Sequence, residues 1–265
     1  MERWQRRRIL ILGKTYPSYS RKYMEVACTG GLFDDTLEMV RLFPMPFRYI
    51  EKTRQFVAWQ YIDVDVERDL SDPRPESYRI RLDSIELSKT IPPTKHDARC
   101  KLLERSPNYF KSVEELLEAQ RERKTSLGIV KPAEIIGFSV EPRAEHERDE
   151  WELKEQEIFA QKTLMGPEPR KLDFPEAKFF IQWRCDDASC TGHKMSIHQW
   201  GIHELYRKLH GDPNAQMKLR DKIAAELDDR VKDIYLFLGN FRGTMYNFGL
   251  MDSYSAKKQR QLELI

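Results

Sequence analysis

The chain has 265 residues, of which 40% are hydrophobic and 33% are charged, and its formal net charge is only +2. This length and apolar content can support one large domain or two small ones, and we expect two modules. The sequence contains no run of about 18 apolar residues, so we expect no membrane-spanning helix and no membrane partner. Four cysteines in a chain of this size do not make a disulfide framework, which favours a reducing, cytoplasmic environment.

Charge is distributed unevenly along the chain. Residues 1–24 contain seven basic groups and one acidic group, whereas residues 141–160 contain eight acidic and three basic groups. The basic end is where a polyanion would dock. Both stretches also fit the solvated faces of a globular protein. The apolar part of the N-terminal stretch spans only Ile9 to Leu12, which is too short for a secretory signal and predicts a first strand.

The first 90 residues have the pattern of short strands separated by turns. Apolar runs and strict alternation predict five strands, at residues 8–14, 23–29, 37–43, 60–66 and 78–87. Gly30-Gly31 is predicted to break the chain before the return strand of a hairpin, and Pro44 to end that strand. Five strands with little helix favour a small barrel.

A helix and a strand pair follow. Ser112 and Glu115 have the spacing of a capping box, which predicts a helix from residue 113 to about residue 124. Residues 126–140 are predicted to form a strand pair broken at Pro132. The acidic stretch 141–160 is interpreted as an exposed insertion or linker.

The second module is predicted to begin near Phe174. It should contain a strand at residues 178–184, helices at 197–209 and 214–232, and closing strands at 234–238 and 246–251. The last helix carries an i, i+4 stripe that we expect in the core, formed by Leu219, Ile223, Leu227 and Val231.

The fold class expected is therefore mixed α+β, with two strand-rich, OB-like barrel modules and helical insertions. The predicted modules span residues 1–111 and 174–265. The helix, strand pair and acidic linker or insertion between them occupy residues 112–173.

Basic and aromatic residues alternate in the first module. Lys and Arg neutralise phosphates, and aromatic faces stack on bases, so this mixture is typical of proteins that hold single strands. The candidate nucleic-acid-binding residues are Lys14, Tyr16, Tyr19, Arg21, Lys22, Arg41, Arg48 and Arg54. We expect Tyr16 and Tyr19 to be more exposed than tyrosines within strands. The alternative is that the tyrosines pack in the core and the basic groups are ordinary surface.

A Cys/His pattern marks the second module. Cys185, Cys190, His193 and His198 give the spacing C-x4-C-x2-H-x4-H, and thiolates and imidazoles at short spacing could hold a structural zinc. The alternative is a hairpin turn whose cysteines are small buried hydrophobes.

Catalytic signatures are weak. Glu152-Leu-Lys154 and Glu176-Ala-Lys178 match half of a metal-dependent nuclease site, but the first lies in the acidic stretch and the second lacks an evident acidic partner. The sequence contains neither G-x-x-x-x-G-K-[ST] nor G-x-G-x-x-G. No catalytic residue is assigned.

Several segments together give a family resemblance. They are ILILGKTYPSYSRKY, VRLFPMPFR, DPRPESYRI, the C-x4-C-x-G-H hairpin followed by MSIHQWGIHELYRKL, and IYLFLGN. With these the chain resembles the dual OB-fold-containing domain proteins of prokaryotic antiviral (conflict) systems. The resemblance implies two OB-like barrels, no known catalytic residues and recognition of nucleic acid in a defence module. It also leads us to expect an acidic residue where His198 stands, which puts the fourth zinc ligand in doubt.

Three functions are compatible with these observations. The first is a non-enzymatic protein that binds or senses single-stranded nucleic acid in an antiviral defence system, with a protein partner from the same system. The second is an enzyme acting on nucleic acid, a nuclease or a base-excising protein. The third is a protein-interaction scaffold whose acidic stretch 141–160 meets a basic partner.

Overall fold

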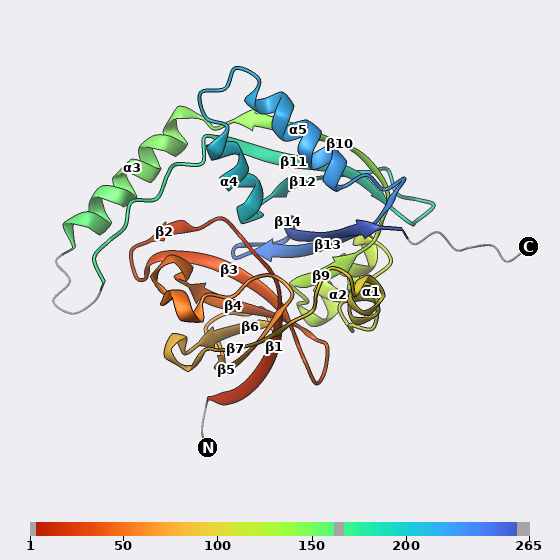
Figure 1. Ribbon diagram of the computed structural model, residues 1–265, viewed down its shortest axis with the longest axis horizontal. Coiled ribbons are helices and arrows are strands. Elements are labelled where there is room, and N and C mark those ends of the chain that lie inside the picture. Colours follow the sequence, from red (N-terminus) through yellow and green to blue (C-terminus); the bar gives the residue numbers. More distant parts are fainter. Residues whose placement is uncertain (1–3, 162–166, 259–265) are drawn as a thin grey trace, which may run out of the picture.

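A computed structural model describes residues 4–161 and 167–258, which form two seven-stranded sheets and five helices (Figure 1). The first sheet comprises β1 (Gln5–Lys14), β2 (Ser18–Ser20), β3 (Met24–Phe33), β4 (Met39–Met45), β5 (Gln60–Arg68), β6 (Ser77–Ile80) and β7 (Glu86–Thr90). The second comprises β8 (Tyr109–Phe110), β9 (Leu127–Val130), β10 (Pro132–Pro142), β11 (Ala177–Cys185), β12 (His193–Ile197), β13 (Lys232–Phe241) and β14 (Thr244–Lys257). The helices are α1 (His96–Glu104), α2 (Val113–Arg123), α3 (Glu145–Ala160), α4 (Trp200–Lys208) and α5 (Ala215–Glu226). The predicted mixed α+β class with strand-rich modules is confirmed.

Five strands of the first sheet close into a barrel. They pair in the order β1-β3-β4-β6-β5, and β5 pairs back onto β1, which completes the ring. Ile62, Val64 and Val66 of β5 point inward, as their alternation with polar residues predicts. The remaining residues of this core include Ile9, Ile11, Val40, Leu42, Met45 and Phe56.

Strand β1 is buried on both faces. Ile9 and Ile11 belong to the barrel interior, whereas Leu10 and Leu12 belong to a second core that lies between the barrel and the second sheet. Side chains alternate across a strand, so one strand can supply two cores. This explains why the sequence shows a continuous apolar run here rather than an alternating one.

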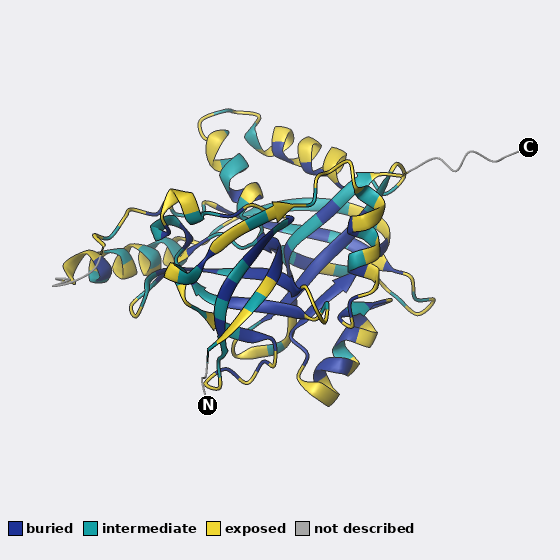
Figure 2. Cartoon of the chain, turned by 60° about the horizontal axis from the view of Figure 1, so that its bottom comes forward, coloured by how far each residue is buried: buried dark blue, intermediate teal, exposed yellow. Residues whose placement is uncertain are grey.

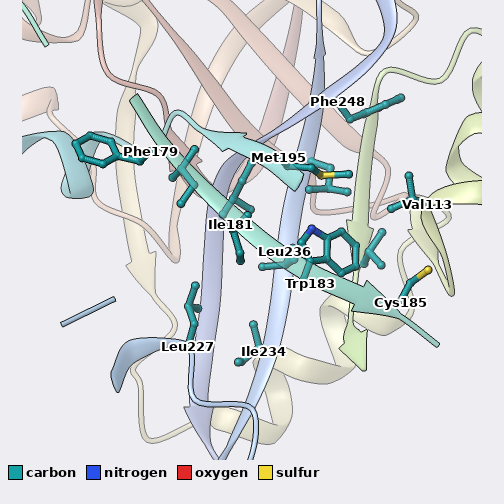
Figure 3. Packing of buried hydrophobic residues seen from close by; sticks show 14 of the residues in the cluster. Val113, Phe179, Ile181, Trp183, Cys185, Met195, Leu227, Ile234, Leu236 and Phe248 are labelled. Carbon is teal, nitrogen blue, oxygen red and sulfur yellow. The ribbon is translucent and has the colours of Figure 1, made fainter. Parts of the chain in front are cut away.

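The second sheet has the strand order β10-β11-β12-β14-β13-β9-β8. Helices α2, α4 and α5 contribute buried residues to the core on one of its faces. Figure 3 shows that core, in which Trp183 and Ile181 of β11 lie close to Leu236 of β13. Figure 2 shows that the helices keep one face exposed while most of the strands are buried. No helix in the described parts of the chain is long and apolar enough to cross a membrane.

Several local predictions need correction. Pro44 does not end its strand, because β4 continues to Met45, and the single strand predicted at residues 78–87 is divided between β6 and β7. Gly30-Gly31 does not break the chain but lies within β3, where a Cβ on Gly31 would come within 2.7 Å of the Leu10 backbone. The predicted exposed insertion contains helix α3, whose Ile158 is buried. Val231 is 55% exposed because α5 ends at Glu226, so it is not part of the core stripe. The three-part division of the chain stays a prediction, and β9 and β10 belong to the second sheet.

Candidate functional site

A cleft of about 330 Å³ lies between the barrel and the second module. One side is formed by the segment after β1 together with β3 and β4, and the other by β13, β14, the helices α3 and α4 and the segments that precede them. The lining residues are Thr15, Tyr16, Pro17, Ser18, Val26, Cys28, Arg41, Phe43, Arg74, Arg143, Trp151, Pro175, His198, His203, Gly239, Asn240, Phe241, Arg242 and Met251.

The lining carries positive charge and no carboxylate. It includes four arginines and two histidines, namely Arg41, Arg74, Arg143, Arg242, His198 and His203, but no Asp or Glu. A cleft that gathers charge of one sign between low-dielectric walls concentrates the electric field and attracts counter-ions. The arrangement therefore favours an anionic ligand.

Arg41 is the most deeply buried of these charges that has no acidic partner. Its side chain donates to the Cys28 Sγ at 3.2 Å and to the Ser126 carbonyl oxygen at 3.0 Å, and the residue is only 4% exposed. Among the described residues Arg41 forms no direct ion pair, and its Nε has no hydrogen-bond partner. The buried Glu76 carboxylate lies one hydrogen bond further on, because the Ser126 hydroxyl accepts from Arg41 at 3.3 Å and donates to the Glu76 Oε2 at 2.7 Å. An anion in the cleft would approach the side of Arg41 that this carboxylate does not contact.

The other three arginines differ in how far they are neutralised. Arg74 forms a buried ion pair with Asp72 at 2.6 Å. Arg143 pairs with Glu147 at 2.7 Å, on the first turn of α3. Arg242 is exposed in the turn between β13 and β14 and has no ion pair in the described part of the chain. Arg41 and Arg242 are thus the two arginines of the cleft without a direct ion pair in the described part of the chain, and Arg41 reaches a carboxylate only through Ser126.

Unpaired polar atoms gather at the same cleft. The Nε atoms of Arg41 and Arg143, the Trp151 Nε1 and the Asn240 Oδ1 are buried, and none has a hydrogen-bond partner among the described residues. Asn240 is 1% exposed, and its Nδ2 already donates to the Met245 carbonyl oxygen at 2.8 Å. Buried polar atoms in native proteins are nearly always paired. Three donors and one acceptor beside the cleft are therefore without a partner, and small side-chain movements would be needed for a ligand to reach them.

Aromatic rings line the cleft beside these polar atoms. Tyr16 stacks on His203 with the ring centroids 4.8 Å apart, and Phe241 packs edge-on against His198 at 4.8 Å. Burial lowers the pKa of His203 to about 3, with the positive charges of His198 and Arg143 adding to the effect. Burial and Arg143 lower the pKa of His198 to about 4. Both imidazoles are neutral at pH 7, so the positive charge of the cleft lies on its arginines.

Most of the predicted basic residues are engaged elsewhere. Arg21 pairs with Glu157 at 2.6 Å, Arg48 with the buried Glu25 at 2.6 Å, and Arg54 with Glu51 at 3.8 Å. The Lys14 Nζ lies 3.4 Å from the centroid of the Phe47 ring, and burial lowers its pKa to about 8. The exposed Lys22 lies over Tyr23, 5.0 Å from the ring centroid. Only Arg41 of the predicted basic set lines the cleft.

The two predicted tyrosines have different environments. Tyr16 is half-buried at the cleft, and its hydroxyl donates to the Asp173 carbonyl oxygen at 2.9 Å. Tyr19 is 9% exposed, and its hydroxyl donates to Glu155 of α3 at 2.6 Å. The expectation that Tyr19 is exposed is therefore wrong, because strand β2 packs under α3.

The structure brings together three of the four predicted metal ligands. Cys185 ends β11, His193 begins β12, and Cys190 lies in the loop between them. The His193 Nε2 lies 3.3 Å from each sulfur, and the three ligand atoms lie within 4.8 Å of one another. His198 is not part of this group. Its Nε2 instead lies 2.8 Å from the Ser196 Oγ, at the cleft.

The half-motifs of a nuclease are not arranged around a metal. Glu176 pairs with Arg148 and Lys178 pairs with Glu147, the latter at 2.7 Å. Within the described residues, the one candidate metal group of His, Cys, Asp or Glu side chains is the Cys/His group.

About half of the cleft is formed by residues that the sequence did not reveal as site residues. Arg143, Trp151, His203, Asn240 and Arg242 line it together with Arg41 but come from segments interpreted as a linker, a helix and a turn. The sequence feature that could have indicated these residues is Asn240, a polar residue that follows Gly239 in a strongly apolar strand. A polar residue in such a strand marks either a turn or a buried site.

Comparisons with known proteins identify the two halves of the chain. Residues 5–105 match the family described as Domain of unknown function (DUF8758), and residues 109–264 match the one described as Domain of unknown function (DUF8757). No curated protein matches the chain. The crystal structure of the p204 HINb domain is similar with a TM-score of 0.33 and 11% sequence identity, covering 97% of this chain and 100% of that chain. Because the second match spans more than half of its length, the chain belongs to the family described as Domain of unknown function (DUF8757).

Proposed function

We propose that the chain binds single-stranded nucleic acid and seats one nucleotide in the cleft between its two modules. The observation that carries this proposal is a lining that contains no carboxylate and two arginines without a direct ion pair among the described residues, Arg41 and Arg242. The phosphate backbone supplies much of the affinity of nucleic-acid binding, and arginine is well suited to phosphate recognition.

The polar atoms of the cleft match the parts of a nucleotide. The free Nε of Arg41 and the exposed guanidinium of Arg242 are donors for phosphate oxygens. The Asn240 Oδ1 is an acceptor for an exocyclic amino group of a base. Trp151 and Phe241 offer ring faces or edges to the base, and such stacking contributes about 1 to 3 kcal/mol per base.

Size favours a single strand over a duplex. A volume of about 330 Å³ lies at the lower end of the range of small-molecule sites. A base inside an intact duplex cannot enter such a cleft without leaving the stack, which costs a few kcal/mol. An unpaired base enters without that cost.

The biological setting is proposed from sequence alone. The resemblance to dual OB-fold-containing domain proteins supports a cytoplasmic role in prokaryotic antiviral defence, with a protein partner from the same system. We propose binding without a catalytic step, as the family resemblance implies. The alternatives are an enzyme acting on nucleic acid and a protein-interaction scaffold.

Fluorescence anisotropy with labelled single-stranded DNA, single-stranded RNA and duplex DNA tests the proposal. We expect single strands to bind more tightly than the duplex, with an affinity that falls steeply as salt rises. Arg242→Ala should weaken binding about 10-fold by removing one phosphate contact, at roughly 1.4 kcal/mol per factor of ten. Arg230→Ala is the matched control, because Arg230 is an 84% exposed arginine in the turn before β13 and does not line the cleft.

Two results would contradict the proposal. Equal loss of affinity in Arg242→Ala and Arg230→Ala would show that positive charge contributes to nucleic-acid affinity regardless of whether it lies at the cleft. Cleavage or base release with Mg²⁺ would establish the enzymatic alternative. Arg21→Ala tests the basic residues that the sequence predicted to bind nucleic acid in the first module. We expect little change in affinity, because Arg21 already pairs with Glu157.

We propose in addition that Cys185, Cys190 and His193 hold a structural zinc ion. In a tetrahedral site with Zn–S of about 2.3 Å and Zn–N of about 2.0 Å, neighbouring ligand atoms lie about 3.5 to 3.8 Å apart. The observed 3.3 Å separations differ from this by only a few tenths of an ångström, so the residues fit the metal. Zinc would be bound by the two thiolates and the neutral imidazole and would fix the loop of the hairpin.

A further inference from the structure

The carboxylate of Glu114 lies beside the Cys/His group. The spacing of the Cys/His motif gives no sign of this residue. Glu114 is in the first turn of α2, far from the β11–β12 hairpin in the sequence. The Cys185 Sγ donates to the Glu114 Oε2 at 3.3 Å, and the Glu114 Oε1 lies 3.9 Å from the His193 Nε2. One carboxylate thus approaches two members of the group, with a different oxygen toward each.

The start of α2 is held against the end of β11 by packing. Ser112 caps the helix by accepting a hydrogen bond from the Glu115 backbone N–H at 3.1 Å, which fixes where the first turn begins. Val113 and Cys185 both belong to the core of the second module, and Figure 3 shows them at the same end of the β11 strand. The position of Glu114 beside the hairpin is therefore built into the fold.

The charge of Glu114 has no basic partner. Within the described residues its only ion-pair neighbour is His193, and no lysine or arginine lies within 4.0 Å of it. Its side chain is 47% exposed and is therefore free to change rotamer toward the metal. A carboxylate beside two thiols and an imidazole, without a cation, is the donor set expected around a divalent metal.

His198 cannot complete the site. Residues His193–Ile197 form the extended strand β12, so His198 lies about five residues, or roughly 16 Å, along the chain from His193. Asp187, within the hairpin loop, is also engaged, because it accepts hydrogen bonds from the Ser189 backbone and hydroxyl at 2.8 and 2.7 Å. Glu114 is the remaining candidate with observed contacts to the group.

We infer that Glu114 is the fourth protein ligand of the metal, so that a zinc ion held by Cys185, Cys190, His193 and Glu114 fastens the start of α2 to the β11–β12 hairpin. The inference rests on the proposed zinc site and adds to it the ligand that closes it. Four protein ligands leave no position for water, so the metal has a structural role.

The test measures zinc in the full chain purified without a histidine tag. We expect about one zinc per chain by elemental analysis, as for a closed four-ligand site. In competition with a chromophoric chelator, Glu114→Ala and Glu114→Gln should each bind zinc at least 10-fold more weakly than the wild-type chain. Glu118→Ala is the matched control, because Glu118 is an exposed glutamate one helical turn further along α2. Its zinc affinity should equal that of the wild type.

Cobalt supplies a readout that does not depend on stability. The Co²⁺-substituted wild-type chain should show the visible absorption of a tetrahedral site with sulfur ligands, and Glu114→Ala should change these bands while leaving the far-UV circular dichroism unchanged. Wild-type zinc affinity and an unchanged cobalt spectrum in both Glu114 variants would overturn the assignment of Glu114 and leave a three-ligand site. Absence of zinc from the wild-type chain, with equal melting temperatures for wild type and Cys190→Ser, would overturn the zinc site itself.

Discussion

The Tyr16 ring of the barrel module stacks on the His203 imidazole of α4, with ring centroids 4.8 Å apart. The Tyr16 backbone N–H also donates to the His198 carbonyl oxygen at 2.8 Å. These contacts join the segment after β1 to the second module at the edge of the cleft. The geometry of the cleft therefore depends on contacts between the modules as much as on either module alone.

Replacing Tyr16 by Ala should lower the free energy of unfolding by about 1 to 3 kcal/mol. The ring stacking contributes about 0.5 to 1.5 kcal/mol, and the hydrogen bond to the Asp173 carbonyl oxygen contributes a similar amount. Tyr16→Phe keeps the ring and should lose only the contribution of the hydrogen bond to the Asp173 carbonyl oxygen. Urea denaturation measures both. Wild-type stability in Tyr16→Ala would agree with the exposed tyrosine predicted from the sequence and would contradict the packing described here.

His203 should make the chain less stable in mild acid. Its folded-state pKa is lowered to about 3 by burial, whereas the unfolded chain takes up a proton below about pH 6.5. The unfolded state therefore binds more protons between these values. The contribution of His203 to the free energy of unfolding should therefore fall by about 1.4 kcal/mol per pH unit as the pH drops below 6.5, and should not change above it.

Urea denaturation at pH 7.5, 6.5 and 5.5 measures this effect. His203→Gln removes the titrating group and should show a smaller decrease between pH 6.5 and 5.5 than the wild type. His210→Ala, which changes an exposed histidine in the turn after α4, should behave as the wild type does. An equal decrease in His203→Gln would mean that another group is responsible.

Removing the partner of the buried Arg74 should be strongly destabilising. Asp72 and Arg74 are 4% and 6% exposed, and their side chains form an ion pair at 2.6 Å. Asp72→Ala would leave the guanidinium buried without a counter-charge, which costs about 3 to 5 kcal/mol. Asp228→Ala is the control, because its partner Arg230 is 84% exposed and surface pairs contribute about 0 to 1 kcal/mol. Equal effects of the two substitutions on the urea midpoint would contradict the role of burial.

Gly13 lies so close to Asp252 that there is no room for a side chain at position 13. A Cβ on Gly13 would lie 2.0 Å from the Asp252 Oδ2 and 2.3 Å from its Cβ, across the contact between β1 and β14. Gly13→Ala should therefore lower the melting temperature, with a cost of about 1 to 3 kcal/mol from overpacking. Gly137→Ala in β10 is the control, since nothing lies within 4 Å of its added Cβ. A melting temperature in Gly13→Ala equal to that of Gly137→Ala would refute the contact.

The sequence predicted the elements that are determined by residues lying close together in the chain. The alternation in β5 predicted its inward face, and Ser112 with Glu115 predicted the start of α2. Helix α3 was missed because it buries only Ile158 and so lacks the apolar stripe from which a helix is inferred. A helix that is held mainly by polar contacts and buries a single apolar side chain carries almost no periodic hydrophobic signal.

The candidate sites depend on contacts between distant segments, which the sequence does not encode as spacing. Arg41 and Asn240 meet only because the barrel packs on the second sheet, and Glu114 reaches the Cys/His hairpin only through the packing of α2. The C-x4-C-x2-H-x4-H spacing predicted His198 as the fourth ligand, but strand β12 carries His198 away from the other three.

The division of β1 between two cores has a consequence for expression of the separate halves. Ile9 and Ile11 fill the barrel while Leu10 and Leu12 cover the second module, so each half presents its neighbour with an apolar surface that this neighbour buries. A separated half would expose this surface to water and should be prone to aggregation. The two halves should therefore remain soluble together more readily than apart.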